Sequence, residues 1–140
     1  MKNLFLILLC LVSFNSFAKE VAAPKAVEPT GKVFFANLKD GQTISQDFKV
    51  QFGLEGMTVK KAGDAEDKKS GHHHLLINQD AIASGQVIPA DENHLHFGQA
   101  QTETQLKLKP GTYKLTLQFA DGAHRSYGEK LSATVKVTVK

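Results

Sequence analysis

Hydrophobic and polar residues alternate along much of this chain, with the two-residue period of half-buried β-strands. The alternation is clearest over residues 47–54, where Phe48, Val50 and Phe52 share one phase and lysine and glutamine take the other. No stretch shows a convincing 3.6-residue period, so the pattern predicts an all-β fold. We expect strands over residues 32–36, 47–54, 71–77, 94–97, 102–109, 112–120 and 130–139.

Short strands separated by turn signals are typical of an antiparallel β-sandwich, and we expect about six to eight of them in immunoglobulin-like order. Tyr113 follows the Pro110–Gly111 turn and opens the penultimate strand, which resembles the tyrosine corner of such sandwiches. The inward phase of the strands predicts the core. Its expected members are Phe48, Val50, Phe52, Leu75, Leu106, Leu115, Leu117, Val135 and Val137.

The first residues have the pattern of a secretory signal peptide, which we place at residues 1–18. Lys2 is the positive end, residues 4–12 form an apolar run too short to span a membrane, and Ala18 is the small residue at the cleavage point. Cleavage there removes Cys10, the only cysteine, so disulfides and thiolate ligands are excluded from the mature chain. We therefore expect a bacterial periplasmic or secreted protein.

Residues 19–31 read as a tether rich in proline and alanine, and residues 32–140 as one domain. The formal net charge of +3 is thinly spread, and basic residues do not alternate with aromatic ones as on a nucleic-acid surface. Residues 59–70 are polar and charged without a period, and we expect a solvated, mobile loop there.

The six histidines fall in three places, and we expect the fold to bring them together. In a strand, residues i and i+2 share a face, so His72 pairs with His74, and His94 pairs with His96. In immunoglobulin-like order both pairs lie at one end of the sandwich, with His124 in a loop beside them.

Imidazole nitrogens at this spacing predict a divalent transition-metal site, for copper or zinc. The expected ligands are His72, His74, His94, His96 and His124. His73 has the opposite phase and is assigned a supporting role. Met57 and Asp121 are possible further supporting groups, although methionine more often fills gaps in a core.

At these same residues the chain resembles the bacterial domain-of-unknown-function family 4399. The specific elements are Gly71 to Ile77 (GHHHLLI) and His94 to Gly98 (HLHFG), and further matches extend over nearly all of the expected domain. The resemblance implies a small exported bacterial protein without an assigned activity.

Three functions remain open from the sequence. The first is a metal-binding module for sequestration or delivery of copper or zinc. The second is an enzyme with a histidine-bound ion that activates water or carries out redox chemistry, although no catalytic residue, and no general base or nucleophile with an orienting group, is evident. The third is an interaction domain without metal, whose protein partner the sequence does not identify.

Overall fold

The computed structural model describes residues 30–64 and 67–140. The predicted signal peptide and residues 19–29 of the predicted tether lie outside the described residues. No helix in the described part of the chain is long and apolar enough to cross a membrane. Its elements are β1 (Lys32–Phe35), β2 (Gln42–Ile44), β3 (Asp47–Glu55), β4 (Thr58–Val59), β5 (Ser70–Ile77), β6 (His94–Phe97), β7 (Glu103–Lys107), β8 (Gly111–Ala120), the 3₁₀ turn η1 (Glu129–Leu131) and β9 (Ser132–Val139).

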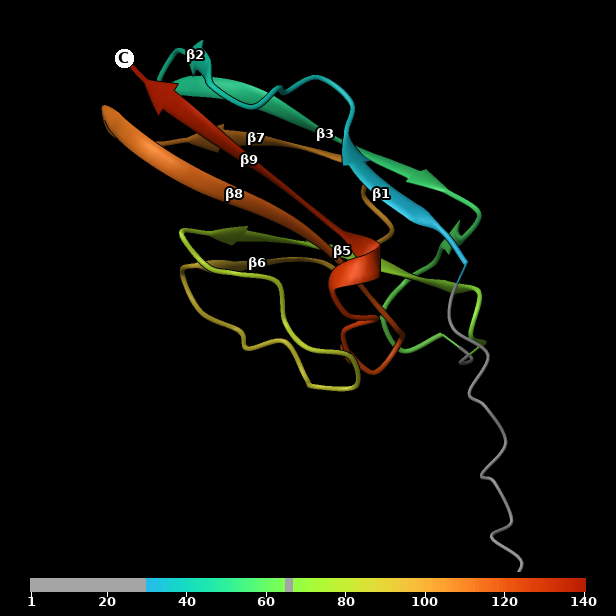
Figure 1. Ribbon diagram of the computed structural model, residues 1–140. Coiled ribbons are helices and arrows are strands. Elements are labelled where there is room, and N and C mark those ends of the chain that lie inside the picture. Colours follow the sequence, from blue (N-terminus) through green and yellow to red (C-terminus); the bar gives the residue numbers. More distant parts are fainter. Residues whose placement is uncertain (1–29, 65–66) are drawn as a thin grey trace, which may run out of the picture.

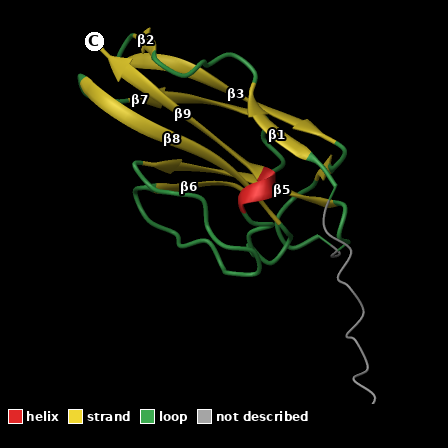
Figure 2. Cartoon of the chain, viewed as in Figure 1, coloured by secondary structure: helices red, strands yellow, loops and turns green. Residues whose placement is uncertain are grey.

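The strands form the two layers of a β-sandwich (Figures 1 and 2). One sheet has the order β1-β3-β7, and the other follows β2-β9-β8-β5-β4, with β6 paired to β5. Apart from the short β2 and β4, strands β1, β3 and β7 thus share one layer, and β5, β6, β8 and β9 share the other, as in immunoglobulin-like sandwiches. The all-β sandwich predicted from the alternation is confirmed.

The core fills the space between the sheets, and all nine residues predicted for it are buried. The period-2 pattern succeeds because each strand turns one face to the opposite sheet. The Tyr113 hydroxyl donates to the carbonyl oxygen of Lys109 at 3.0 Å, across the turn that precedes β8. This contact has the form of the expected tyrosine corner.

Two short strands were not predicted from the sequence, because they are too short to show a period. Both pair in parallel with another strand. β2 adds to β9, and β4 adds to β5. The expectation of a solvated loop over residues 59–70 is therefore wrong at both ends. Val59 lies in β4, Ser70 is the first residue of β5, and the Lys60 amide donates to Gly71 at 2.7 Å.

Candidate metal centre

Strand β5 supplies the two most deeply buried imidazoles of the candidate site. Its residues alternate between the sandwich core and the outer face of the six-stranded sheet, and all eight are buried. Leu75 and Ile77 join the core, so His72 and His74 point to the outer face. Residues 78–93 fold back over that face, where Gln79 and Ile82 hydrogen-bond to side chains of β8. The outer face of β5 is consequently enclosed.

Strand pairing brings His96 beside His74. The two residues are direct partners in the antiparallel pairing of β5 with β6. Opposite residues in such a pair place their side chains on the same face, within reach of each other.

His124 reaches the same place from the turn that follows β8. The last residue of β8, Ala120, pairs with His72, so the turn begins next to that imidazole. Asp121 Oδ1 accepts hydrogen bonds from the amides of Ala123 and Arg125, each at 2.9 Å. These bonds shape a tight turn in which His124 has a left-handed φ of 64°.

The four imidazoles form one cluster, with ring centroids 4.8 to 6.0 Å apart for all six pairs. The Nε2 atoms of His72 and His74 are 3.0 Å apart, and those of His96 and His124 are 3.2 Å apart. One ring nitrogen from each of His72, His74 and His96 lies within 4.8 Å of the others. We call His72 and His74 the inner pair and His96 and His124 the outer pair.

The two shortest nitrogen separations match those between ligands of a single ion. Metal–imidazole bonds of about 2.0–2.1 Å place neighbouring donors roughly 2.8–3.4 Å apart, from square-planar to tetrahedral geometry. Both Nε2 pairs lie in this range. The donor set present in the structure therefore suits a divalent transition metal.

Burial keeps the inner pair neutral, which is the form that binds a metal. Loss of hydration, and then the neighbouring imidazoles His96 and His124, lower the pKa of His72 from 6.5 to about 4. Burial together with the surrounding histidines lowers the pKa of His74 to about 3, and the pKa of His96 is lowered by the same causes. The Nδ1 atoms of the inner pair have no hydrogen-bond partner among the described residues, so strand geometry and packing orient these rings.

Two predicted residues do not join the cluster. His94 shares the outward phase of His96, but it lies opposite Leu76, and its Nδ1 is 2.8 Å from Asp91 Oδ1. His73 faces the core, with its ring centroid 5.2 Å from that of Phe52 and 5.0 Å from that of Phe119. His73 therefore does not support the cluster by direct contact, because its ring packs between phenylalanines of the core.

The other two supporting candidates also have different places. Met57 packs against the hydrophobic core, where its side chain adjoins Gly31. The Asp121 carboxylate is engaged by the turn amides and by the Arg125 guanidinium, whose Nε donates at 2.8 Å. Asp121 consequently positions His124 through the backbone.

Sequence reasoning missed the residues that make room for the outer pair. A Cβ on Gly98 would overlap the His96 ring, so glycine at this position allows the imidazole to lie across the backbone. The amides of Ala62 and Gly63 donate to the carbonyls of Gly98 and Gly122, each at 2.9 Å. The sequence offered one signal for this role, a glycine two positions after a strand histidine. Such a glycine lies on the same face as the histidine and leaves space for its ring.

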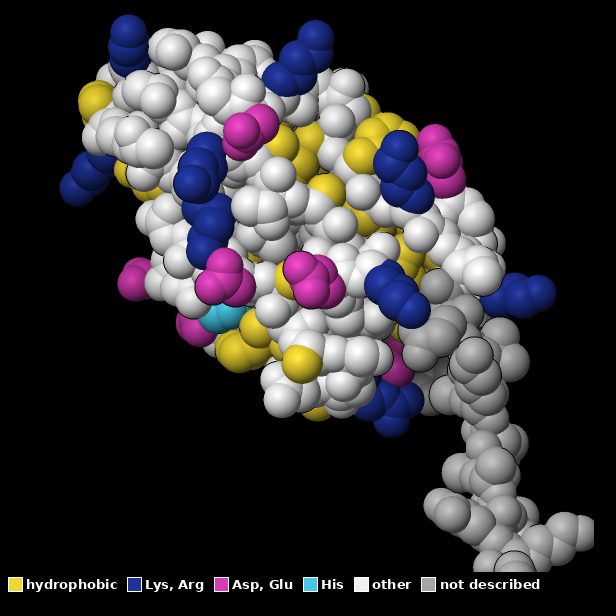
Figure 3. Space-filling model, viewed as in Figure 1, with side chains coloured by type: hydrophobic (Ala, Val, Ile, Leu, Met, Phe, Trp, Pro, Cys, Tyr) yellow, Lys and Arg dark blue, Asp and Glu magenta, His cyan; other side chains and the backbone are white. Residues whose placement is uncertain are grey.

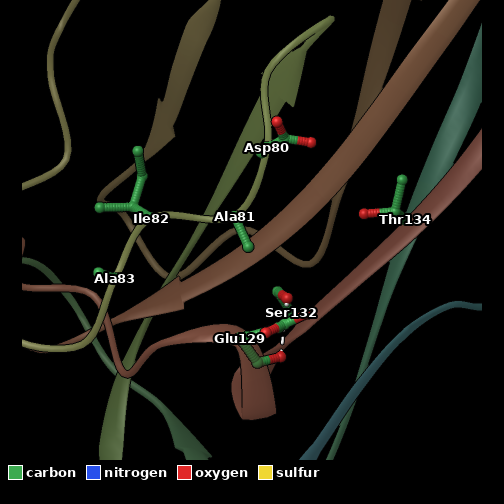
Figure 4. Close-up of a pocket in the computed structure, with 7 residues that line it drawn as sticks. All are labelled: Asp80, Ala81, Ile82, Ala83, Glu129, Ser132 and Thr134. Carbon is green, nitrogen blue, oxygen red and sulfur yellow. Dashed lines mark hydrogen bonds between the residues drawn. The ribbon is translucent and has the colours of Figure 1, made fainter.

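The face shown in Figure 3 offers no stronger candidate for a functional site. Lysines are spread among acidic side chains there, and histidine appears as one small patch. A separate open hollow of about 390 Å³ lies between residues 80–83 and the start of β9 (Figure 4). Its lining contains no histidine, and Asp80 in its wall is paired with Lys114.

A family model described as "Domain of unknown function (DUF4399)" matches residues 50–140, which include all six histidines. No curated protein and no solved structure gives a significant match.

Proposed function

Because the chain belongs to the DUF4399 family of domains of unknown function, whose description assigns no activity, we propose its function from the histidine cluster alone. The protein binds one divalent copper or zinc ion through His72, His74, His96 and His124, and sequesters or delivers that ion. The convergence of four imidazoles, with Nε2 separations of 3.0 and 3.2 Å, carries this proposal.

A metal ion explains the cluster better than hydrogen bonding does. Each short contact between two neutral imidazoles needs one N–H donor and one bare nitrogen. Two such hydrogen bonds therefore use the Nε2 lone pairs of only two of the four rings. One ion satisfies all four Nε2 lone pairs together. Neutral rings in the inner pair also require little proton displacement when the ion binds.

The ligand chemistry favours copper(II) or zinc. The described residues contain no cysteine, and Met57 packs away from the cluster. Imidazole suits both metals, whereas thiolate or thioether would favour copper(I). His94 and Asp121, which the sequence placed at the site, are committed to other contacts.

Four protein ligands favour holding the ion over catalysis. Catalytic zinc sites usually keep one position open for water, and four imidazoles fill a tetrahedral site. The predicted signal peptide supports a periplasmic or secreted location, where free transition-metal ions can be encountered. Sequestration or delivery is therefore the function that we favour over an enzyme.

Calorimetric titration of copper and zinc into the untagged, metal-free protein tests the proposal. We expect one ion per chain, bound more tightly than about 0.1 mM. His96→Ala and His124→Ala should each weaken binding, because each removes a ligand from the less buried side of the site. His94→Ala is the matched control, since it removes an imidazole from the same strand and should leave affinity unchanged.

Absence of binding for both ions would refute the metal assignment and favour an interaction domain. A loss of binding in His94→Ala as large as that in His96→Ala would show that the ligand set is wrong. Turnover by the loaded protein would instead support the enzymatic alternative.

A further inference from the structure

The two halves of the cluster differ in how firmly the fold holds them. His72 and His74 lie on β5, which is paired with β8 on one side and with β6 and β4 on the other. They are 0% and 1% exposed. His96 is exposed on the four-residue strand β6, and His124 is half-buried in a turn. The sheet therefore holds the backbone of the inner pair on both sides, whereas the outer pair lies on a short strand and in a turn.

One short segment ties the two outer ligands together. The consecutive amides of Ala62 and Gly63 donate to Gly98, two residues after His96, and to Gly122, two residues before His124. These bonds join two segments that are distant in the sequence and that have no strand pairing with each other among the described residues. We call residues 62–63 the clamp.

We propose that the ion enters and leaves through the outer pair by ligand exchange with an acceptor, and that the clamp sets the rate of this exchange. This inference rests on the proposed function. The acceptor is a protein site or small chelator with nitrogen and carboxylate donors that can replace His96 and His124 one at a time. In each step one metal–nitrogen bond breaks as one bond from the acceptor forms, and the ion keeps its charge.

The geometry favours this order of exchange. An acceptor can approach the exposed side of His96, while residues 78–93 and the sheet enclose the inner pair. The ion would remain held by His72 and His74 while the outer bonds are exchanged. Spontaneous loss of all four ligands would require a much larger cost before any new bond forms.

Transfer of Cu²⁺ from the loaded full chain to EDTA tests the inference by stopped-flow absorbance of the copper–imidazole bands. We expect the observed rate to rise in proportion to the EDTA concentration. Gly122→Ala should accelerate transfer by about tenfold, a typical effect of disturbing the support of a metal ligand. Its Cβ would lie 2.9 Å from the Asp64 carbonyl oxygen and would push the segment after the clamp away from the turn.

Ala62→Pro provides an independent variant, because it removes the N–H that bonds to Gly98. Lys61→Ala is the matched control, since it changes an exposed side chain beside the clamp and keeps its backbone donors. Melting temperatures of the metal-free variants establish that each is folded. Clamp variants should exchange copper faster than Lys61→Ala.

A rate independent of EDTA concentration would overturn the inference, because the ion would then leave before the acceptor binds. Folded clamp variants that transfer copper at the rate of the unchanged protein would overturn the role of the clamp. A prior titration that shows no stoichiometric copper binding would refute the proposed function itself, so the two failures are distinguishable.

Discussion

The His96 imidazole lies across the backbone of Gly98, so closely that a Cβ on that glycine would overlap Cε1 and Nε2 of the ring. His96 is the exposed member of the cluster. Gly98 thus decides where this imidazole sits, although it contributes no donor to the candidate site.

Gly98→Ala should therefore weaken copper and zinc binding while leaving the fold intact. We expect affinity to fall by about 10- to 100-fold, the usual effect of removing the support of a ligand. Calorimetry measures the affinity, and thermal unfolding of the metal-free protein serves as the stability control. Unchanged affinity would show that the His96 ring does not need this position.

His73 should destabilise the folded state, because both of its ring nitrogens are buried without a hydrogen-bond partner among the described residues. His73→Phe puts an apolar ring of similar shape between Phe52 and Phe119. We expect the free energy of unfolding to rise by about 1–3 kcal/mol, the usual cost of an unpaired buried polar group. Urea denaturation at pH 7 measures this change, and metal affinity should stay the same because His73 faces away from the cluster. A destabilised variant would show that the histidine has a partner in the core.

The metal-free protein should lose stability in mild acid. Burial lowers the pKa of His72 and His73 to about 4 and that of His74 to about 3, against 6.5 for an ordinary histidine. As the pH falls below about 6.5, these histidines become protonated in the unfolded chain but stay neutral in the folded chain. The free energy of unfolding therefore decreases as the pH falls toward about 4.

Urea midpoints between pH 7 and pH 4 test this dependence. His73→Phe should show a shallower decline, because one of the three buried imidazoles is gone. A midpoint that stays constant across this range would mean that the rings are protonated as easily in the folded state as in the unfolded state.

Leu117 lies on β8 opposite Ala133 of β9 and beside Leu75 of β5, and it is fully buried. Leu117→Ala should lower the free energy of unfolding by about 2–5 kcal/mol through lost burial and the cavity left behind. Chemical denaturation measures the loss. Lys114→Ala on the outer phase of the same strand is the comparison, and equal effects of the two variants would contradict the assigned core face.

Local periodicity determined most of this fold. The inward phase of Phe48, Val50 and Phe52, like that of Leu115 and Leu117, follows from the two-residue repeat of a strand, which depends only on neighbouring residues. The pairing of His72 with His74 on one face follows from the same repeat. The sequence therefore predicted the sandwich, its core and the placement of the inner pair on one face.

Tertiary structure decided the rest, because it depends on which distant residues come to lie side by side. Register sets His96 opposite His74 and His94 opposite Leu76, and the two-residue alternation does not distinguish these two histidines. The clamp at residues 62–63 links the segments that carry His96 and His124 through backbone hydrogen bonds, which any residue except proline can donate. Such bonds leave no signature in residue type, so only the folded chain shows them.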